Sequence, residues 1–189
     1  MFIDESWFVL WPYPAPGWAQ RGRPRRIPQA KSWDRKHRPP SCALYAAMDT
    51  RERQVSAEWH PTWNQEETWA HLEEILASYQ GQAIRFLVVF WDHGPWHVAR
   101  SVREKIAAYN RCARQTGGMH VLLFYLPIKS PWLMPLEPVF GQTKRAIGGA
   151  DYATLADLQG AVERRLQHRN IRVAERNRNH QLTLSTESN

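Results

Sequence analysis

The sequence predicts an α/β domain in which helices flank a mixed five-stranded sheet, and the order of the expected elements carries this prediction. Five segments rich in apolar and aromatic residues have the pattern of strands, at residues 1–10, 41–48, 54–60, 84–91 and 119–126. Four other segments are expected to be helices, at residues 64–80, 97–115, 135–147 and 152–169. The order strand, hairpin, helix, strand, helix, strand, helix favours three antiparallel strands extended by two parallel ones.

The first expected helix has local signals at both ends. Asn64 is expected to be its N-cap, and Glu67, three residues later, is the matching capping-box partner. Leu72 and Leu76 lie at helical spacing and should face the core. Gly81 then ends the helix.

Residues 84–91 form a nearly continuous apolar run, which is typical of a central parallel strand covered on both faces. Asp92 follows directly, at the carboxyl end of this strand. Because open α/β sheets bind their ligands at that edge, Asp92 is a candidate functional residue.

Three prolines shape the loop after the last strand. Pro127 stops that strand, since proline cannot donate to a sheet ladder, and Pro131 restricts the path of the loop. Pro135 suits the first position of a new helix, which places Glu137 in its first turn. A carboxylate there is favoured by the helix dipole, so Glu137 is a rigidly presented acid.

Asp4 interrupts the apolar first strand. A buried carboxylate needs a partner or a metal ion, because an unpaired charge is costly where the dielectric is low. By itself Asp4 is best explained by a salt bridge at a strand end, and its neighbour Glu5 by pairing with an arginine. If the first strand lies beside the fourth, however, Asp4 and Asp92 become neighbours and Glu137 can approach both.

Three carboxylates at one sheet edge suit hard divalent cations. Mg²⁺ prefers oxygen ligands and keeps several waters, so a few carboxylates and a substrate phosphate complete its coordination. Two such ions can activate the attacking oxygen and stabilise the leaving oxygen of a phosphoryl displacement. The residues themselves therefore indicate metal-dependent phosphoryl transfer.

Three stretches of the chain carry a more specific pattern. They begin at Asp4-Glu5-Ser6, at Asp92 with His97 five residues on, and at Leu126-Pro127, where the sequence reads Leu-Pro-x-x-Ser-Pro-x-Leu-x-Pro-x-Glu up to Glu137. Together they resemble the motifs of mariner-like insertion-sequence transposases, which belong to the DDE superfamily of endonucleases. The resemblance covers roughly residues 1–147, with His93 and Met134 standing where the family usually has asparagine.

The resemblance implies a ribonuclease H-like fold. It also implies that Asp4, Asp92 and Glu137 are the catalytic residues and the metal ligands, that two Mg²⁺ or Mn²⁺ ions bind there, and that His97 lines the site.

The charge of the chain indicates a polyanionic partner. There are 25 Lys and Arg against 18 Asp and Glu, which gives a net charge of +7 and a pI near 9.8. A merely soluble basic surface would explain these numbers as well as nucleic acid would. The candidate phosphate contacts are Arg21, Arg23, Arg25, Arg26, Lys129, Lys144 and Arg145. The first four lie in a proline-rich excursion at residues 11–40, for which a solvated loop is the alternative.

Length and composition limit the remaining possibilities. A chain of 189 residues with 43% hydrophobic and 23% charged residues is expected to be globular. We divide it into a catalytic domain at residues 1–150 and a C-terminal helix with a polar tail at residues 151–189, in which residues 170–189 are expected to fray. No apolar run is long enough to span a membrane, and the two cysteines are expected to stay reduced, so we expect a cytoplasmic, nucleoid-associated protein.

The function expected from these features is that of the catalytic domain of a DDE transposase. It would cut DNA strands and join the freed 3′ hydroxyl to target DNA, with transposon ends and target DNA as partners. The family's helix-turn-helix region is expected to be missing, so the chain is either a truncated copy or a second reading frame. A homodimer and a separate helix-turn-helix protein are further expected partners. The alternatives are a catalytically silent DNA-binding remnant and a metal-dependent nuclease without strand transfer.

Overall fold

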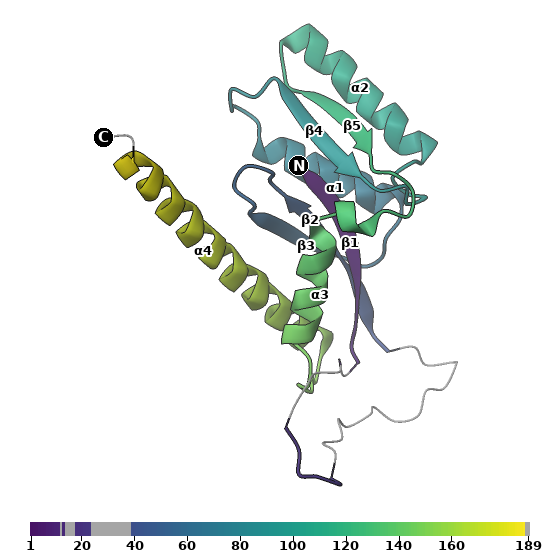
Figure 1. Cartoon of the computed structure of the whole chain (residues 1–189). Coiled ribbons are helices and arrows are strands. Elements are labelled where there is room, and N and C mark those ends of the chain that lie inside the picture. The colour runs from purple at the N-terminus through teal and green to yellow at the C-terminus, as the bar shows by residue number, and fades with distance from the viewer. Residues whose placement is uncertain (12, 14–17, 24–38, 188–189) are drawn as a thin grey trace. The chain divides into compact units, whose positions relative to one another are not determined.

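A computed structural model describes residues 1–11, 13, 18–23 and 39–187. Five strands form one sheet in the order β3-β2-β1-β4-β5 (Figure 1). Their bounds are Phe2–Val9 for β1, Ser41–Met48 for β2, Val55–His60 for β3, Phe86–Trp91 for β4 and His120–Tyr125 for β5. β2 and β3 pair antiparallel, whereas β4 is parallel to both β1 and β5. The first strand therefore lies beside the fourth, as the sequence predicted.

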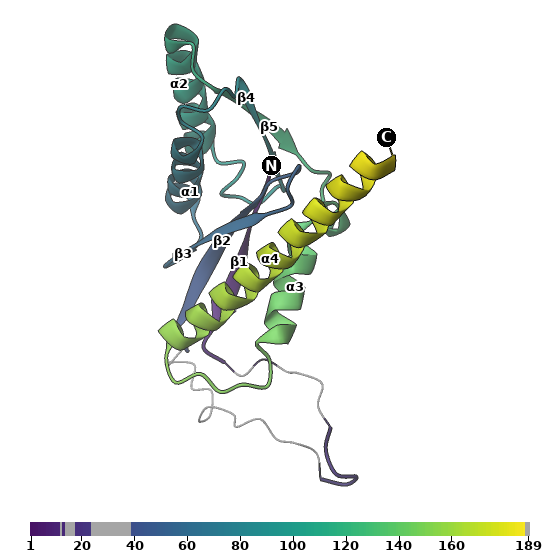
Figure 2. The same cartoon turned by 90° about the vertical axis from the view of Figure 1, so that its left-hand side faces the viewer.

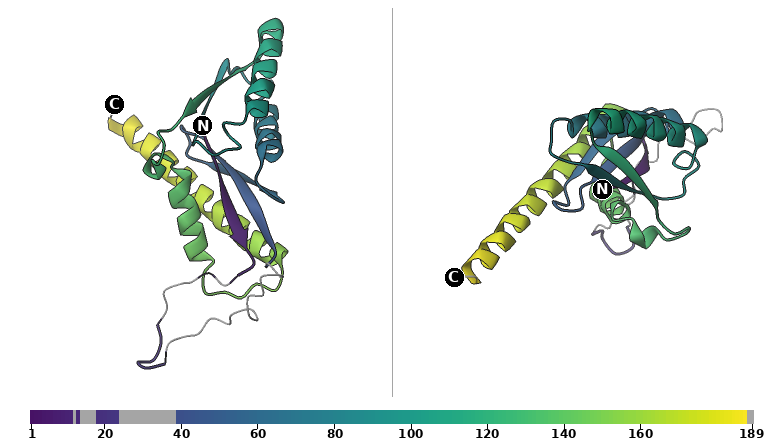
Figure 3. Two further views of the ribbon diagram at one scale, coloured as in Figure 1. Left: turned by 90° about the vertical axis from the view of Figure 1, so that its right-hand side faces the viewer. Right: turned by 90° about the horizontal axis from the view of Figure 1, so that it is seen from above.

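The chain divides into two compact units. The first comprises Met1–Ser6, Cys42–Thr50 and Val55–Glu137, and it contains the whole of α1 (Gln65–Ser78) and α2 (Arg100–Thr116). Figures 2 and 3 show both helices on the same side of the strands. Their apolar side chains pack on alternate residues of the sheet, and the core includes Leu72, Leu76, Leu87, Val89, Trp91, Val102, Ile106 and Val121.

Burial along β4 alternates, and this corrects one prediction. Leu87, Val89 and Trp91 are buried, but Phe86 is 53% exposed, so the strand is not covered on both faces along its length. On its second face the aromatic side chains cover one another: the ring of Phe90 stacks on Phe2 at a centroid distance of 4.8 Å. An apolar run predicts that a strand is buried. It does not show whether a helix or neighbouring aromatic side chains cover that strand.

Of the two predictions for the start of α1, the N-cap at Asn64 is confirmed and the capping box with Glu67 is not. The side chain of Asn64 accepts a hydrogen bond from the backbone N–H of Glu67 at 2.9 Å, so Asn64 is the N-cap. The capping-box prediction for the Glu67 side chain is wrong, because its carboxylate lies 2.6 Å from Nδ1 of His60. The backbone N–H of Asn64 donates to the Tyr45 hydroxyl instead.

The last strand leads through a short 3₁₀ helix, Pro131–Leu133, to α3 (Leu136–Ala146). The second compact unit includes most of α3 and all of α4 (Leu155–Glu187). The prediction that residues 170–189 fray is wrong as far as Glu187, because α4 continues to that residue. The described helices include none that is both long enough and apolar enough to cross a lipid bilayer.

Two properties explain the length of α4. No glycine or proline follows Gly160, so nothing in the chain interrupts the helix once it has formed. The helix also contacts the turn between β2 and β3: Asn170 accepts a hydrogen bond from Gln54, and Asn177 donates one to the carbonyl of Glu52. The polar composition of residues 170–189 predicted fraying. The hydrogen bonds just described hold part of this segment without an apolar face on the helix.

Candidate active site

Strand pairing brings Asp4 and Asp92 to the same level of the sheet. Phe2 is the register partner of Phe90 in the parallel pair of β1 and β4. Asp4 and Asp92 each follow two residues later along these strands, so the two carboxylates belong to adjacent positions. Asp4 is 8% exposed, whereas the side chain of Asp92 is 55% exposed.

Glu137 is the second residue of α3, as the prolines predicted. Its backbone N–H donates to the carbonyl of Met134 at 3.2 Å, which anchors the start of the helix to the 3₁₀ turn. Met134, at a position where the resembled family usually has asparagine, is buried. The Glu137 residue itself is exposed and belongs to the same compact unit as Asp4 and Asp92.

The electrostatics of Asp4 link the three acids. The pKa of Asp4 is raised to about 8, first by burial and then by the negative charges of Glu5, Asp92 and Glu137. A backbone hydrogen bond from Glu5 to Asp4 Oδ1, at 3.0 Å, opposes this rise. Asp4, Asp92 and Glu137, hereafter the acidic site, thus lie within electrostatic range of one another.

Asp92 is held by two hydrogen bonds. Its Oδ1 accepts one from His97 Nδ1 at 2.6 Å and one from the backbone N–H of Gly94 at 2.8 Å. The bond from His97 is the main reason that the pKa of Asp92 is lowered, although burial acts against it. Gly94 lets the loop close here, because a Cβ on this residue would lie 3.1 Å from Asp92 Oδ1.

His97 connects Asp92 to Glu5. The imidazole is fully buried, and its Nε2 lies 2.8 Å from Glu5 Oε1, while its ring stacks on Trp91 at 4.9 Å. Burial alone would lower the pKa of His97, but the charge of Glu5 and the hydrogen bond with Asp92 outweigh it and raise the pKa to about 9. His97 is therefore an imidazolium that donates to both carboxylates.

Glu5 was not predicted as part of this network. Its side chain is 2% exposed and, besides His97, accepts a hydrogen bond from Trp96 Nε1 at 3.0 Å. The expected arginine partner is wrong, because these two residues occupy the carboxylate. The pairing depends on the register of β1 and β4, and no local sequence pattern around Glu5 indicates it.

The predicted phosphate contacts lie in different surroundings. Lys129 is exposed and has a positive φ of 59°. The ammonium of Lys144 lies 5.1 Å from the centre of the Phe8 ring, so this cation makes a cation–π contact within the protein. The other residues of this set fall into two groups: Arg145, Arg21 and Arg23 are exposed, and Arg25 and Arg26 lie outside the described residues.

Comparisons with known proteins identify the family and the fold. A family model described as DDE superfamily endonuclease matches residues 1–159. No curated protein sequence is similar enough to count as a relative. The crystal structure of the mariner Mos1 paired end complex with Mg has a TM-score of 0.65 at 18% identity, covering 93% of this chain and 52% of that chain.

Two further Mos1 structures show the same fold. The paired end complex with Mn has a TM-score of 0.59 at 17% identity, over 93% of this chain and 52% of that chain. The catalytic domain of Mos1 mariner transposase has a TM-score of 0.56 at 16% identity, over 92% of this chain and 75% of that chain. The chain therefore spans about half the length of the Mos1 chains in those complexes. Its mixed sheet with flanking helices is the ribonuclease H-like fold of these proteins.

Proposed function

Since the chain belongs to the family of DDE superfamily endonucleases, we propose that it is the catalytic domain of a transposase. In this proposal it cleaves DNA strands and joins the freed 3′ hydroxyl to target DNA. The observation that supports it best is the parallel register of β1 and β4, which sets Asp4 beside Asp92 while Glu137 adds its charge to the pair.

We propose that Asp4, Asp92 and Glu137 hold two Mg²⁺ or Mn²⁺ ions. The donor set fits these ions, because it consists of carboxylate oxygens. The pKa of Asp4 is raised first by burial and then by the neighbouring carboxylates, and a bound cation would offset both effects. When bound, such ions activate the attacking oxygen and stabilise the leaving oxygen of a phosphoryl displacement. The exposure of Asp92 leaves room for a substrate phosphate.

The buried network prepares Asp92 for this role. His97 donates to Asp92 Oδ1 and keeps that carboxylate ionised, so its second oxygen can face a ligand. Glu5 in turn holds the imidazolium from the other side. We therefore propose that His97 and Glu5 are positioning residues, which act through Asp92 and do not touch the substrate.

DNA is the proposed partner, both as transposon ends and as target. The exposed cations Lys129 and Arg145, with the arginines of the excursion, would contact phosphates and carry little sequence information. We propose a second copy of this chain and a separate helix-turn-helix protein as further partners, and a cytoplasmic, nucleoid-associated location. Residues 1–150 are the proposed catalytic domain, and residues 151–189, most of them in α4, the C-terminal segment.

A cleavage and joining assay tests the proposal. Labelled duplexes and supercoiled plasmid are incubated with the protein and Mg²⁺ or Mn²⁺, with the Asp92→Asn variant as the control. Metal-dependent nicks and joined products that the variant lacks are the expected result. Cleavage without joining would instead make the protein a nuclease, and a folded protein that cuts nothing would be the silent DNA-binding remnant.

A further inference from the structure

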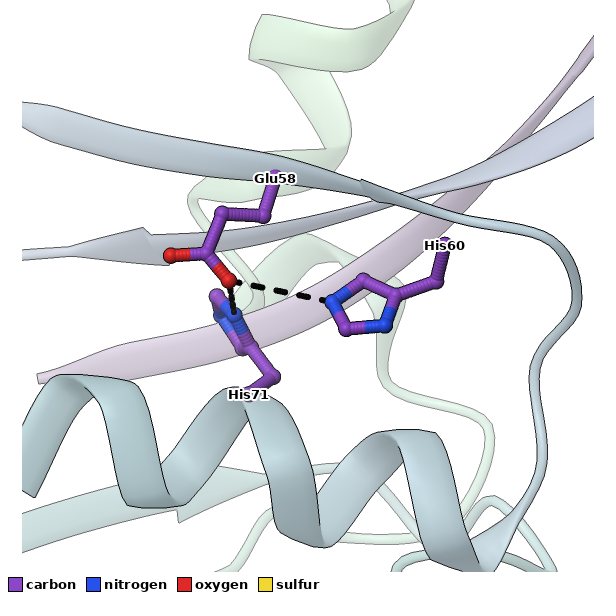
Figure 4. A group of neighbouring side chains, drawn as sticks. All are labelled: Glu58, His60 and His71. Carbon is purple, nitrogen blue, oxygen red and sulfur yellow. Dashed lines mark hydrogen bonds and ion pairs between the residues drawn. The ribbon is translucent and has the colours of Figure 1, made fainter.

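A second group of metal-binding side chains lies apart from the acidic site. Glu58 and His60 belong to β3, and His71 belongs to α1. In the part of the chain that the structure describes, these three form the group whose potential ligand atoms all lie within 4.8 Å of one another. Figure 4 shows the Glu58 carboxylate turned toward both imidazoles. We call these three residues the β3–α1 cluster.

His60 turns one ring nitrogen, Nε2, into the cluster without a hydrogen-bond partner. Its Nδ1 lies 2.6 Å from Oε2 of Glu67, so the ring donates its proton there. Nε2 is buried in a side chain that is 10% exposed, and Oε2 of Glu58 lies 3.7 Å from it, too far for a hydrogen bond. A cation bound between these two atoms would satisfy both.

The distances within the cluster also favour a shared ion. Glu58 Oε2 lies 3.3 Å from His71 Nδ1 and 3.7 Å from His60 Nε2. Charge-assisted hydrogen bonds are shorter, about 2.7–2.9 Å. Ligand atoms at about 2.0–2.1 Å from a tetrahedral Zn²⁺ lie about 3.3 Å from one another. Both distances are compatible with ligands around one small ion, and the shorter one is at the same time a hydrogen bond between His71 and Glu58.

We propose that Glu58, His60 and His71 bind a divalent transition-metal ion of the zinc class. Two imidazoles and one carboxylate suit Zn²⁺, Co²⁺ or Ni²⁺, whereas Mg²⁺ prefers oxygen ligands. The Glu58 side chain is 37% exposed, so an ion can reach the cluster from solvent there. The His71 side chain is 1% exposed, so packing restricts its movement. We expect a water to take the fourth position.

The elements explain why such an ion would matter. β3 is an edge strand of the sheet, and His71 joins it to the first helix that follows it in the chain. Glu67 lies one turn before His71 on α1 and orients His60, as carboxylates do behind zinc-bound histidines. The ion would fasten the edge strand to α1, so its role is structural. This inference stands on side chains separate from the acidic site and does not depend on the proposed function.

Cobalt spectroscopy tests the site directly. We expect the full chain, after treatment with chelator, to bind one Co²⁺ with the visible absorption of a tetrahedral ion, and Zn²⁺ to displace it. Millimolar Mg²⁺ should leave the absorption unchanged. Glu58→Gln and His60→Gln should each weaken binding by about 10–100-fold or more, and Glu67→Gln, which loosens His60, by roughly 10-fold. Glu73→Gln removes the same charge from an exposed position of α1 and should change nothing.

Each outcome decides the matter. If the Co²⁺ absorption persists in both Glu58→Gln and His60→Gln, the ion binds elsewhere and the proposal is overturned. It is also overturned if Asp92→Asn abolishes the absorption, because the ion would then occupy the acidic site. Folding is checked from thermal midpoints in chelator. If Glu58→Gln fails to fold, Glu67→Gln at the solvent side of His60 still decides, since unchanged Co²⁺ affinity there contradicts the assigned geometry.

Discussion

The acidic site and the β3–α1 cluster are two groups of potential metal ligands in one compact unit, and they differ in chemistry and in exposure. The acidic site offers only oxygens, is drawn from β1, β4 and α3, and leaves Asp92 half open to solvent. The β3–α1 cluster offers two imidazoles and one carboxylate within 4.8 Å. Oxygen ligands on separate elements suit ions that keep waters and receive a substrate, whereas close imidazoles suit an ion that stays in place.

The two groups also manage negative charge differently. At the acidic site the carboxylates repel one another, which helps raise the pKa of Asp4 to about 8 after the larger contribution of burial. In the cluster the pKa of Glu58 is lowered to about 2, chiefly by its hydrogen bond with His71. The carboxylates of the acidic site repel one another without a cation, whereas Glu58 is the one acid beside two imidazoles in the three-residue cluster. The difference predicts which ion each will take.

The largest effect expected is that of Asp92→Asn on strand cleavage. The amide keeps the shape and the acceptor for His97 but loses the charge that would hold the proposed metal ions. Metal contributions of several kcal/mol correspond to a loss of about 10³-fold in cleavage rate. Rates are measured by plasmid nicking with Mn²⁺, and Co²⁺ absorption at the β3–α1 cluster should be unaffected. If Asp92→Asn still cleaves DNA at the original rate, Asp92 has no catalytic role, and the contrast between the acidic site and the β3–α1 cluster fails.

A smaller loss is expected from Glu5→Gln. The amide can still accept from Trp96, but the charge that holds His97 as an imidazolium is gone, so Asp92 accepts from a neutral ring and its negative charge is less well stabilised. Cleavage and Mg²⁺ affinity should fall by about 10–100-fold, as for other residues that orient a metal ligand. The pH at which activity is half lost on the alkaline side should move down, because the pKa of His97 falls with the charge of Glu5. A purely structural role would change the rate without moving that pH.

Substituting Gly94 separates the shape of the acidic site from its charge. The Cβ of Gly94→Ala would lie 3.1 Å from both Asp92 Oδ1 and the Trp96 ring, so the carboxylate must shift by a few tenths of an ångström. We expect a loss of roughly 10-fold in cleavage rate, since small misplacements of reacting groups are costly. Gly141→Ala on α3 is the control, because its Cβ would meet only the flexible end of Arg145. Equal losses in both variants would contradict the assigned role.

Stability without metal should fall as the pH rises. Asp4, with a folded pKa of about 8 against 3.8, loses its contribution progressively between those values, because the unfolded state ionises first. His97, with a folded pKa of about 9 against 6.5, loses its contribution between 6.5 and 9. The decline should be steepest where both act, between about pH 6.5 and 8.

Thermal midpoints across a pH series check this decline. Saturating Mg²⁺ should flatten the part due to Asp4, because the ion binds its ionised form, and Asp4→Asn should flatten it without metal. Glu58→Gln should leave the slope unchanged, since the β3–α1 cluster has no acid with a raised pKa among its three residues. A midpoint that rises with pH in the absence of metal would show that these two groups do not govern stability.

The smallest effect expected is on DNA affinity. Each phosphate that a cation neutralises releases counterions, so replacing Arg21, Arg23, Arg25 and Arg26 with alanine should reduce the salt slope by up to about 4. Binding of unrelated duplexes, measured across a salt series, should weaken to a similar degree for every sequence. Arg114→Ala on α2 should have no such effect. Tight binding to one sequence that resists salt would place base recognition in this domain.

Much of the fold and the acidic site follows from local signals in the sequence. Apolar runs mark the strands, Asn64 marks the start of α1, and prolines place Glu137 in the first turn of α3. Asp92 was expected at a strand end because the apolar run stops there. Such signals act over a few residues, where backbone sterics, caps and periodicity decide the structure, so they can be read without knowing what packs against what.

Tertiary structure alone decided the rest. Glu67 has the spacing of a capping-box residue, yet the approach of β3 to α1 offers it His60, and a hydrogen bond with that ring replaces the capping-box bond. Glu5 pairs with His97, more than ninety positions away, because β1 and β4 align in parallel. These partners are chosen by strand register and helix docking, which depend on the whole core. Side chains of the same type and spacing would meet other neighbours in another fold, so the sequence determined the elements and the packing determined the networks.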